Sequence, residues 1–299
     1  MLVCRSPQNI AEFEQYYQLR WQVLRQPWGA LRGSERDKFE NSCIHRIVID
    51  ESERVLAVGR LDYTKQFLGQ IRFVAVSPLA QGQGLGQKIM ASLEQKAQQL
   101  GITSLTLKAR ENAIRFYQKV GYQEQEYSHT LFDEVKHFCM QKALTPNSKH
   151  QLDETLALQK IWYDTIPLSK AMNVQISYFD GKSLMTHCAL EFNKNIHDTM
   201  FAGSIYTLAT LSGWGWIYLQ LQQQGLTGTI VLAEANIKYF KPILAPGYAK
   251  LIDEDVTGDV NLLRKGKSTR ISLVVNIYNG EVIAAKFAGS YTVLAAKLQ

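Results

Sequence analysis

The pattern of apolar and polar positions divides the chain into two blocks of secondary structure. In the first block, two helical patterns, 10–24 and 86–100, alternate with short runs rich in β-branched residues. Gly101 follows the second helical pattern, as expected at a helix C-terminus, and another helix is expected from Asn112. The expected strands are 2–6, 45–50, 54–63, 69–76 and 104–109, with two more before residue 145. This alternation predicts an α+β domain built on one mixed sheet.

The second block has a different order of elements. A helical lead at 156–163 precedes two strands, a long apolar helix at 200–221 and four further strands. The expected strands are 173–179, 183–192, 228–240, 247–257, 267–279 and 281–294. One long helix followed by a series of strands predicts an antiparallel sheet curled around that helix.

A polar segment, TPNSKHQLDE at 145–154, separates the two blocks. It contains a proline and has no apolar periodicity, so it is the expected linker. The sequence therefore predicts two domains, 1–145 and 150–299, each long enough to form a core of its own.

The segment 200–221 has no charged residue and is long enough to span a bilayer. Its serine, threonine, glycine and glutamine residues argue against a membrane span, and no Lys or Arg follows it before Lys238. We therefore expect a helix buried inside a domain, and no membrane partner.

Composition narrows the possible partners. The chain carries a net charge of +6 without a basic stripe interleaved with aromatic residues, so we expect no nucleic-acid partner. A modest positive charge suits anionic ligands such as CoA or an acidic carrier protein. The four cysteines lie far apart, so we expect neither a metal site nor disulfide bonds. With no apolar signal segment in the opening residues, the expected location is the cytoplasm.

Three glycines at alternate positions, Gly82, Gly84 and Gly86, stand between an expected strand and an expected helix. A glycine-rich turn at a helix N-terminus exposes N–H groups and the positive end of the helix dipole, which favours an anion, most often phosphate. The segment lacks the Lys-Ser/Thr pair of a nucleoside-triphosphate loop and the glycine spacing of a dinucleotide loop. The sequence therefore predicts a phosphate from another class of ligand.

The segment Gln81–Gly86, QGQGLG, resembles the Q/R-x-x-G-x-G/A loop of GNAT acyltransferases, whose backbone amides bind the pyrophosphate of CoA. Asn112–Tyr122, NAIRFYQKVGY, resembles the second motif of the same family. The resemblance covers the first block and implies that the strand before the loop separates from its neighbour, which frees backbone groups for pantetheine. The implied CoA contacts are Val74, Val76, Gln81, Gly82, Gln83, Gly84, Leu85, Gly86, Gln87 and Asn112.

The same resemblance gives Tyr117 a catalytic role, because the matching tyrosine protonates the departing CoA thiolate. A phenol pKa of ~10 against a thiol pKa of ~8.5 makes full proton transfer unfavourable by about 2 kcal/mol. Hydrogen-bond donation to the developing thiolate is therefore the expected contribution. Two simpler roles stay open, Tyr117 as a core aromatic residue and Asn112 as a helix N-cap.

The acceptor side of this domain departs from the family pattern. The strand before the loop, 71–76, carries no carboxylate that could accept an amine proton, and the substitutes on offer are Asp62, Glu111 and Glu35. Residues expected on the acceptor side are Arg20, Trp21, Arg25, Trp28 and Arg32. These arginines suit an anionic acyl group or acceptor better than a cationic amine, unless they only face solvent.

The second block resembles another family. Residues 195–210, NIHDTMFAGSIYTLAT, resemble the segment N-x-x-G-T-x-H-G-G that opens the central helix of hotdog-fold thioesterases, with matches at Asn195, Thr199 and Gly203. The segment TMFAGS followed by GWGW brings the block closer still to the YiiD-like thioesterase domain, which occurs fused behind a GNAT domain. Both blocks thus resemble this bifunctional family, in the same order.

The second resemblance implies a thioester carbonyl at the helix N-terminus near Ala202 and Gly203, with Asn195 orienting water or the carbonyl. Thr210 stands where many hotdog hydrolases carry an acidic residue, so it is expected to contact substrate. Asp198 or His197 is then left to activate water. The simpler alternatives are an N-cap role for Asp198 and a loop role for His197.

Three functions stay open. The first is a bifunctional enzyme, in which a GNAT domain transfers an acyl group from acetyl-CoA or a related acyl-CoA and a hotdog domain hydrolyses acyl-CoA or acyl-carrier-protein thioesters. The second is a malonyl-thioester decarboxylase that supplies acetyl starters for fatty-acid synthesis. In the third, the hotdog half only senses acyl-CoA or forms dimers. A homodimer or larger oligomer is expected, because one curled sheet covers only part of the apolar helix and two copies would close each other's site.

Overall fold

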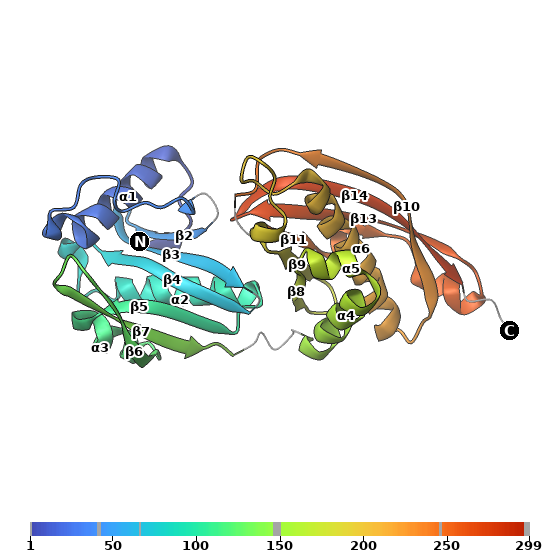
Figure 1. Ribbon diagram of the computed structural model, residues 1–299, viewed down its shortest axis with the longest axis horizontal. Helices are drawn as coiled ribbons and strands as arrows, with labels where there is room; N and C mark the ends of the chain where they lie inside the picture. Colours follow the sequence, from blue (N-terminus) through green and yellow to red (C-terminus); the bar gives the residue numbers. More distant parts are fainter. Residues whose placement is uncertain (1, 41–42, 66, 146–150, 245–246, 296–299) are drawn as a thin grey trace. The chain divides into compact units, whose positions relative to one another are not determined.

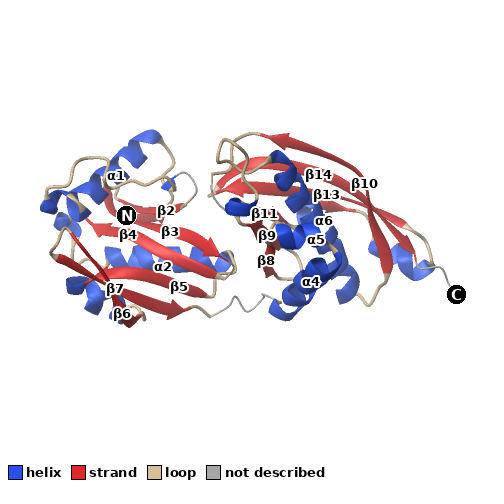
Figure 2. Cartoon of the chain, in the orientation of Figure 1, coloured by secondary structure: helices blue, strands red, loops and turns tan. Residues whose placement is uncertain are grey.

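The computed structural model describes residues 2–40, 43–65, 67–145, 151–244 and 247–295 of the chain. The chain divides into two compact units, Met1–Asn147 and Ser148–Gln299, each with its own sheet (Figure 1). Strands and helices are interleaved along the first unit, whereas the second ends in a series of long strands (Figure 2). Residues 146–150 of the expected linker lie outside the described residues.

A mixed sheet forms the centre of the first unit. Its strands are β1 Val3–Arg5, β2 Ile44–Ile49, β3 Val55–Lys65, β4 Leu68–Val76, β5 Ser104–Arg110, β6 Gln123–Leu131 and β7 Val135–Ala143. Their order in the sheet is β1-β2-β3-β4-β5-β7-β6. β4 and β5 are parallel, and the other neighbours are antiparallel. The helices are α1 Ile10–Leu24, α2 Leu85–Gln99 and α3 Ile114–Lys119, with 3₁₀ turns that include η1 Gln26–Trp28 and η4 Glu111–Ala113.

Helices cover both faces of this sheet. Val58 of β3 belongs to a buried cluster with Tyr16 of α1, whereas a Cβ at the neighbouring Gly59 would lie 2.6 Å from Ile89 of α2. Adjacent residues of a strand point to opposite faces, so α1 and α2 lie on opposite sides of β3. The close approach of α2 to the sheet therefore requires glycine at residue 59.

β4 and β5 separate part-way along their length. They pair only from Leu68 with Ser104 to Ile71 with Leu107, although both strands continue further. Phe73 of β4 has a φ of +53°, in the left-handed region, and lies within a register shift between β3 and β4. A bulge of this kind bends a strand away from its neighbour. The separation agrees with the one that the GNAT resemblance implies.

An antiparallel sheet forms the second unit. Its strands are β8 Val174–Phe179, β9 Leu184–Cys188, β10 Gly228–Tyr239, β11 Tyr248–Leu251, β12 Val256–Thr257, β13 Thr269–Asn279 and β14 Val282–Ala295. Their order is β10-β14-β13-β11-β9-β8, with β12 beside β13. The helices are α4 Leu152–Thr165, α5 Pro167–Ala171 and α6 Ala202–Gln223. α4 begins inside the segment 145–154 expected as a linker, because Asp153 and Glu154 suit the positive N-terminus of a helix.

α6 is the central helix of the second unit and contacts β9, β10, β11, β13 and β14. Two glycines allow close packing: a Cβ at Gly213 would lie 2.6 Å from Tyr291 Oη, and one at Gly215 would lie 2.5 Å from the ring of Trp162 in α4. Trp162 is 0 % exposed and belongs to the apolar core of this unit. Within the described ranges, none of the helices has the length and apolar character that a bilayer crossing requires.

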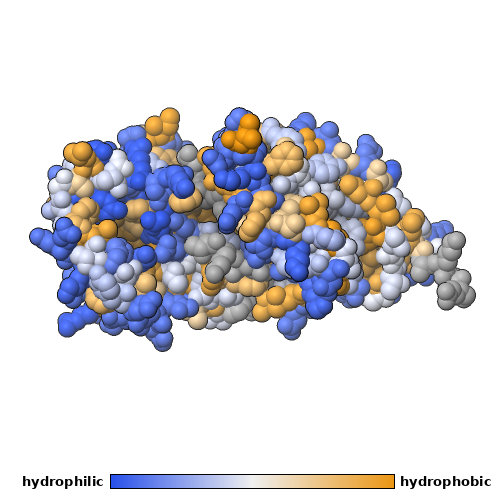
Figure 3. Space-filling model, viewed as in Figure 1, coloured by the Kyte–Doolittle hydropathy of each residue, from blue (hydrophilic) through white to orange (hydrophobic). Residues whose placement is uncertain are grey.

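Hydrophobic residues on the face shown in Figure 3 lie in small groups among hydrophilic ones. The most exposed large apolar side chains, Ile10, Leu31, Leu79 and Ile196, come from separate segments of the chain. Scattered groups of this kind are ordinary on a protein surface.

Candidate functional site

A cavity of about 1000 Å³ lies in the first unit, along the part of β4 and β5 where the two strands separate. Its walls come from the end of α1, β4, the glycine loop with the first turn of α2, β5, α3 and the β6–β7 pair. The expected site residues on its surface are Val74, Val76, Gln81, Gly82, Gly84, Leu85, Gly86, Gln87, Asn112, Tyr117 and Arg25. Gln83 is exposed in the same loop but does not line the cavity. A cavity of this volume can hold a small-molecule cofactor or substrate.

The glycine loop forms one wall of the cavity, and left-handed backbone shapes it. Gly82 has a φ of +77° and Gly84 a φ of +75°, conformations that glycine adopts without strain. Gly84 is the N-cap of α2, and no described side chain caps the helix there. The N–H groups of the first turn therefore lack a protein acceptor and, with the helix dipole, favour an anion.

Tyr117 of α3 borders the cavity beside two other aromatic side chains. Its ring centroid lies 5.0 Å from that of Phe116 and 6.1 Å from that of Tyr122. Burial raises the pKa of Tyr117 to about 12, against a smaller opposing effect of the charge of Arg110. The phenol therefore keeps its proton at neutral pH. It can donate a hydrogen bond to a ligand while its ring packs against its neighbours, so the two roles left open for Tyr117 are compatible.

Asn112 lies in η4 and is exposed at the surface of the cavity. The N-cap of α3 is Ala113, and no described side chain caps that helix. The alternative role as an N-cap is therefore wrong for Asn112. Its amide group is available to a ligand in the cavity.

A group of side chains that sequence reasoning did not bring together forms another part of the cavity wall. Arg25 comes from the end of α1, Arg110 from β5, His137 from β7 and His129 from β6. Arg110 is opposite His137, and His137 is opposite His129, so these three side chains share one face of the sheet. The two imidazole rings are stacked, with centroids 4.8 Å apart. We refer to these four residues as the Arg–His wall.

His137 has one ring nitrogen available for proton transfer. Its Nδ1 lies 2.9 Å from the backbone oxygen of Val135, which can only accept, so Nδ1 carries the proton. Nε2 of the neutral ring is then a proton acceptor. Burial lowers the pKa of His137 below its usual value, and the charges of His129, Arg110 and Arg25 act in the same direction. The ring is therefore neutral at pH 7.

Arg20, expected on the acceptor side, lies instead in a buried ionic network. Its guanidinium group donates to both carboxylate oxygens of Glu40, at 2.8 and 2.9 Å, and it is 0 % exposed. Arg60, also 0 % exposed, binds Glu40, Asp37 and Asp62. Because a buried charge is costly without a partner, this network holds the fold together and keeps Arg20 away from the cavity surface.

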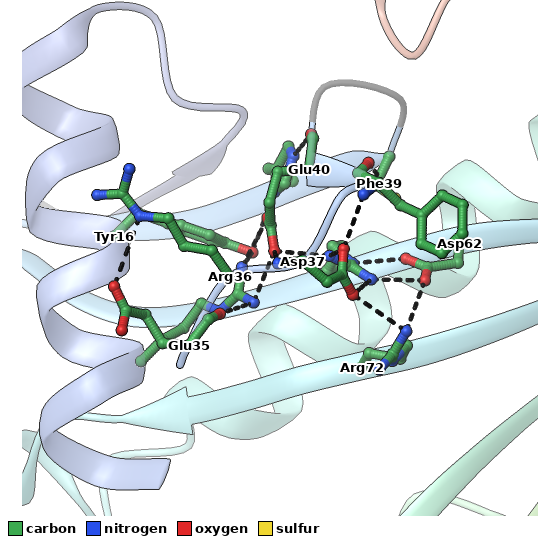
Figure 4. A network of polar contacts seen from close by, with 12 residues as sticks. Tyr16, Glu35, Arg36, Asp37, Phe39, Glu40, Asp62 and Arg72 are labelled. Atoms are coloured by element: carbon green, nitrogen blue, oxygen red, sulfur yellow. Dashed lines mark hydrogen bonds and ion pairs between the residues drawn. The ribbon is translucent and has the colours of Figure 1, made fainter. Parts of the chain in front are cut away.

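Two of the carboxylates expected as proton acceptors already have partners within the protein. Asp62 lies 2.6 Å from Arg60 and 3.5 Å from Arg72, and Figure 4 shows it turned toward Arg72. Glu35 is buried and accepts a hydrogen bond from the N–H of Gly33 at 2.7 Å. Glu111 is exposed in η4 and does not line the cavity. His137, which the sequence did not single out, is better placed than any of the three.

Trp28 and Arg32 also lie outside the cavity surface, but with different surroundings. The ring of Trp28 stacks on that of Phe132 at 5.9 Å, and the guanidinium group of Arg110 lies 4.2 Å from its centroid. Trp28 therefore packs against Arg110 of the Arg–His wall without lining the cavity itself. Arg32 is exposed and lies over the ring of Trp21 at 5.3 Å.

In the second unit, Asn195 organises the loop before α6. Its Oδ1 accepts from the N–H groups of His197 at 2.8 Å and Thr199 at 3.3 Å, and its Nδ2 donates to Thr199 Oγ1 at 3.0 Å. Asp198 is exposed, has a φ of +55° and pairs with Lys194 at 2.8 Å. The N-cap of α6 is Phe201, without a described side-chain cap, so the N-cap alternative for Asp198 is wrong.

Phe201 covers the first turn of α6. A Cβ at Gly203 would lie 2.4 Å from the Phe201 ring, and Tyr239 Oη donates to the backbone oxygen of Ala202 at 3.1 Å. Thr210 lies two turns after Gly203, on the same side of α6. Its buried Oγ1 has no hydrogen-bond partner among the described residues. The site residues expected in the second unit therefore lie along α6 and the loop before it.

A mixed sheet whose two parallel strands separate beside a helix N-terminus is the GNAT fold, and an antiparallel sheet around one central helix is the hotdog fold. Residues 13–122 match the "Acetyltransferase (GNAT) family", and residues 155–295 match the family described as "Putative thioesterase (yiiD_Cterm)". Residues 13–122 thus form a GNAT acetyltransferase domain, and residues 155–295 form a domain of this putative thioesterase family. These matches confirm both resemblances in the sequence, and the two sheets confirm the fold class expected from them.

The chain is also similar to individual proteins. The chain is 31% identical over 115 residues to "Uncharacterized protein YyaT" of Bacillus subtilis (strain 168), which covers 38% of this chain and 74% of that protein. It is 27% identical over 134 residues to "Uncharacterized N-acetyltransferase YjcF" of the same organism, over 45% of this chain and 94% of that one. It is 35% identical to a solved "putative thioesterase" from Shewanella oneidensis, over 48% of this chain and 99% of that one, with a TM-score of 0.47. GNAT enzymes use acyl-CoA as a substrate, so the first unit is an enzyme of the transferase kind.

Proposed function

We propose that the first unit transfers an acyl group from acetyl-CoA, or a related acyl-CoA, to an acceptor amine. The observation that carries the proposal is the placement of an anion-binding loop, a separated β4 and the Tyr117 phenol around one cavity. In this proposal the loop at 82–87 binds the pyrophosphate of CoA. The pantetheine arm lies along β4 at Val74 and Val76, whose backbone is not paired with β5, and Asn112 contacts it from η4.

The transfer step uses side chains at two places in the cavity. The amine nitrogen attacks the thioester carbonyl carbon, the C–N bond forms, and the C–S bond breaks to release CoA thiolate. Tyr117 stabilises the thiolate by a hydrogen bond, since a pKa of about 12 against ~8.5 for a thiol makes complete proton transfer unfavourable by about 5 kcal/mol. His137 Nε2 accepts the amine proton and passes it to solvent, from which the thiolate takes its own proton.

We propose that the second unit acts on thioesters of CoA or of an acyl carrier protein. The thioester carbonyl would lie at the N–H groups of Ala202 and Gly203, where the helix dipole polarises it. Asn195 holds the loop before the helix, Asp198 would assist water, and Phe201 with Thr210 would border the acyl chain. Support comes from the family match of residues 155–295 and from the loop geometry around Asn195.

We further propose that two copies associate through the second unit. β10 is an edge strand, paired with β14 and with no other described strand. Exposed apolar side chains lie on it and just beyond its end, with Val231 46 %, Tyr239 47 % and Phe240 54 % exposed. An exposed strand edge is a template for pairing with another strand.

Products distinguish these activities. The full chain would be incubated with acetyl-, malonyl- and long-chain acyl-CoA, with and without carrier protein and a mixture of amines, and the products followed by mass spectrometry. Acyl transfer yields an acylated amine and CoA, hydrolysis yields a free acid and CoA, and malonyl decarboxylation leaves an acetyl thioester intact. If calorimetry detects no CoA binding and no thioester is consumed, the proposal is wrong.

A further inference from the structure

We propose that Arg25 and Arg110 form a carboxylate-binding site in the cavity of the first unit. The carboxylate belongs either to the acceptor amine or to the acyl group of the donor, and both sources share the same chemistry. The inference rests on the proposed acyl transfer, because it concerns the same cavity. Its distinguishing feature is Arg110, which the sequence did not connect with Arg25.

Among the described residues, the two arginines lack carboxylate partners of the kind that Arg20 and Arg60 have. Within the described residues, neither Arg25 nor Arg110 forms an ion pair, whereas Arg20 and Arg60 each bind carboxylates. Two half-buried positive charges close together are unfavourable without an anion. The arrangement is therefore suited to a negatively charged group supplied by a ligand.

Backbone carbonyls fix the two guanidinium groups next to each other. Arg25 Nη1 and Arg110 Nη2 both donate to the backbone oxygen of Leu24, at 3.2 and 2.9 Å, and Arg25 Nε donates to that of Ser34 at 3.0 Å. The remaining N–H groups include Arg25 Nη2 and Arg110 Nη1. Two arginines held by one carbonyl can thus offer donors to the two oxygens of a carboxylate.

Aromatic rings hold the same guanidinium groups from another direction. Trp28 lies 4.2 Å from Arg110, and Phe132, which stacks on Trp28, lies 5.9 Å from Arg25. Cation–π contacts restrict the rotamers of both arginines before a ligand arrives. The site is therefore preorganised, and little side-chain entropy remains to be lost on binding.

The surroundings favour a carboxylate of a reacting group over a second phosphate of CoA. The first turn of α2 already provides an anion site in a different wall of the cavity. Arg110 lies close enough to Tyr117 for its charge to affect the pKa of the phenol, and it is opposite His137 in the sheet. A carboxylate at Arg110 would thus accompany the group that reacts between Tyr117 and His137.

The test compares matched ligands that differ only in the carboxylate. One arm supplies acetyl-CoA with free amino acids or with their carboxamides and measures kcat/KM. The other arm measures calorimetric affinities for malonyl- and succinyl-CoA against acetyl- and butyryl-CoA. We expect the carboxylate member of one pair to be preferred by roughly 10-fold to 100-fold. The pair that shows the preference identifies the source of the carboxylate.

Substitutions assign that preference to the site. Arg25→Gln and Arg110→Gln should each remove most of it and leave the affinity for acetyl-CoA within about twofold of the unsubstituted protein. Arg32→Gln is the matched control, because Arg32 is exposed in the same segment and lies outside the cavity surface. Circular dichroism melts confirm that the variants fold.

The outcomes separate this inference from the proposed function. The carboxylate site is wrong if acetyl-CoA binds but neither pair of ligands shows a preference. It is also wrong if a protein that carries both Arg25→Gln and Arg110→Gln keeps the preference. In both cases the proposed acyl transfer stands. If acetyl-CoA does not bind, the proposed function fails. A preference for malonyl- or succinyl-CoA that Arg110→Gln abolishes would then still support the carboxylate site. If no such preference is measured, the carboxylate site is wrong as well.

Discussion

A Cβ at Gly86 would lie 3.0 Å from the ring of Phe116. Gly86 belongs to the first turn of α2, and Phe116 precedes Tyr117 in α3. The contact joins the two sequence motifs that resemble the GNAT family and holds the glycine loop close to α3. We therefore expect a larger residue at Gly86 to disturb both the loop and Tyr117.

Gly84→Asp should weaken binding of acetyl-CoA by at least about 10-fold, because it places a carboxylate where a phosphate is expected. Gly84→Asn is the matched control. Asparagine has the same shape and also tolerates a φ of +75°, and a Cβ at this position would lie at an ordinary contact distance of 3.9 Å from Gln87 Oε1. Calorimetry on both variants measures the effect of charge alone. If the two variants bind acetyl-CoA with equal affinity, the loop does not bind a phosphate.

Tyr117→Phe should lower kcat for acyl transfer by roughly 10-fold to 100-fold and leave the affinity for acetyl-CoA nearly unchanged, since the hydrogen bond forms only with the developing thiolate. Tyr127→Phe provides the control, because Tyr127 is exposed and its hydroxyl group is hydrogen-bonded to Thr130 Oγ1. Steady-state rates and calorimetry give the two quantities. In a malonyl decarboxylase no thiolate leaves, so an unchanged rate for Tyr117→Phe would exclude transfer as the main reaction.

The pH dependence of acyl transfer tests His137. Burial lowers its pKa from the usual 6.5, so the neutral base is present at pH 7, and kcat/KM should fall only as the pH drops through that lowered value. His137→Gln should remove this acidic limb and reduce the plateau by about 100-fold.

His129→Gln is the informative control for that profile. The charge of His129 helps to lower the pKa of His137, so its removal should move the acidic limb toward higher pH without abolishing it. A limb that persists in His137→Gln would show that another group accepts the proton.

Gly215→Ala should destabilise the second unit, although alanine favours helices. The added Cβ would lie 2.5 Å from the fully buried Trp162 ring, and overpacking of this kind outweighs the gain of about 1 kcal/mol in helix propensity. We expect a net loss of about 1–2 kcal/mol in urea denaturation followed by tryptophan fluorescence. Gln222→Ala, at an exposed position of α6, should change stability by less than about 0.5 kcal/mol. Equal midpoints for the two variants would contradict the packing.

Light scattering of the full chain tests the proposed association of two copies. We expect a dimer or a larger assembly at micromolar concentration, because the free edge of β10 carries exposed apolar residues. The matched variant replaces Val231 by Lys, a residue that protects natural edge strands, and should shift the protein toward monomers. A monomer at all concentrations would leave the second unit to act without a shared site.

Local patterns in the sequence predict the elements well where the signals are strong. The helix expected at 10–24 is found at Ile10–Leu24, because its amphipathic pattern is preceded by an Asn9 cap that accepts from the N–H of Glu12. The glycine loop was also found from the sequence, since its backbone conformation itself requires glycine.

Contacts between distant segments were not predictable from the same signals. The grouping of Arg110, His137 and His129 depends on the register of β5, β7 and β6, which no local pattern specifies. Arg20 was expected on the acceptor side together with the other arginines of its segment, but Glu40, twenty residues later, binds it in the interior. An arginine with a buried carboxylate partner and one without look alike in a sequence.

The acyl donor and the acceptor of the first unit would bind to surfaces that differ in how easily a substitution changes them. At the glycine loop, the donors are main-chain N–H groups of the first turn of α2, which most substitutions at exposed Gln81 or Gln87 would leave in place. The Arg–His wall is built from side chains, so a single codon change there alters what it recognises. During divergence, relatives would therefore change acceptor specificity sooner than they lose the acyl donor. Directed evolution of this protein should follow the same order, with variants of the Arg–His wall explored on an unchanged glycine loop.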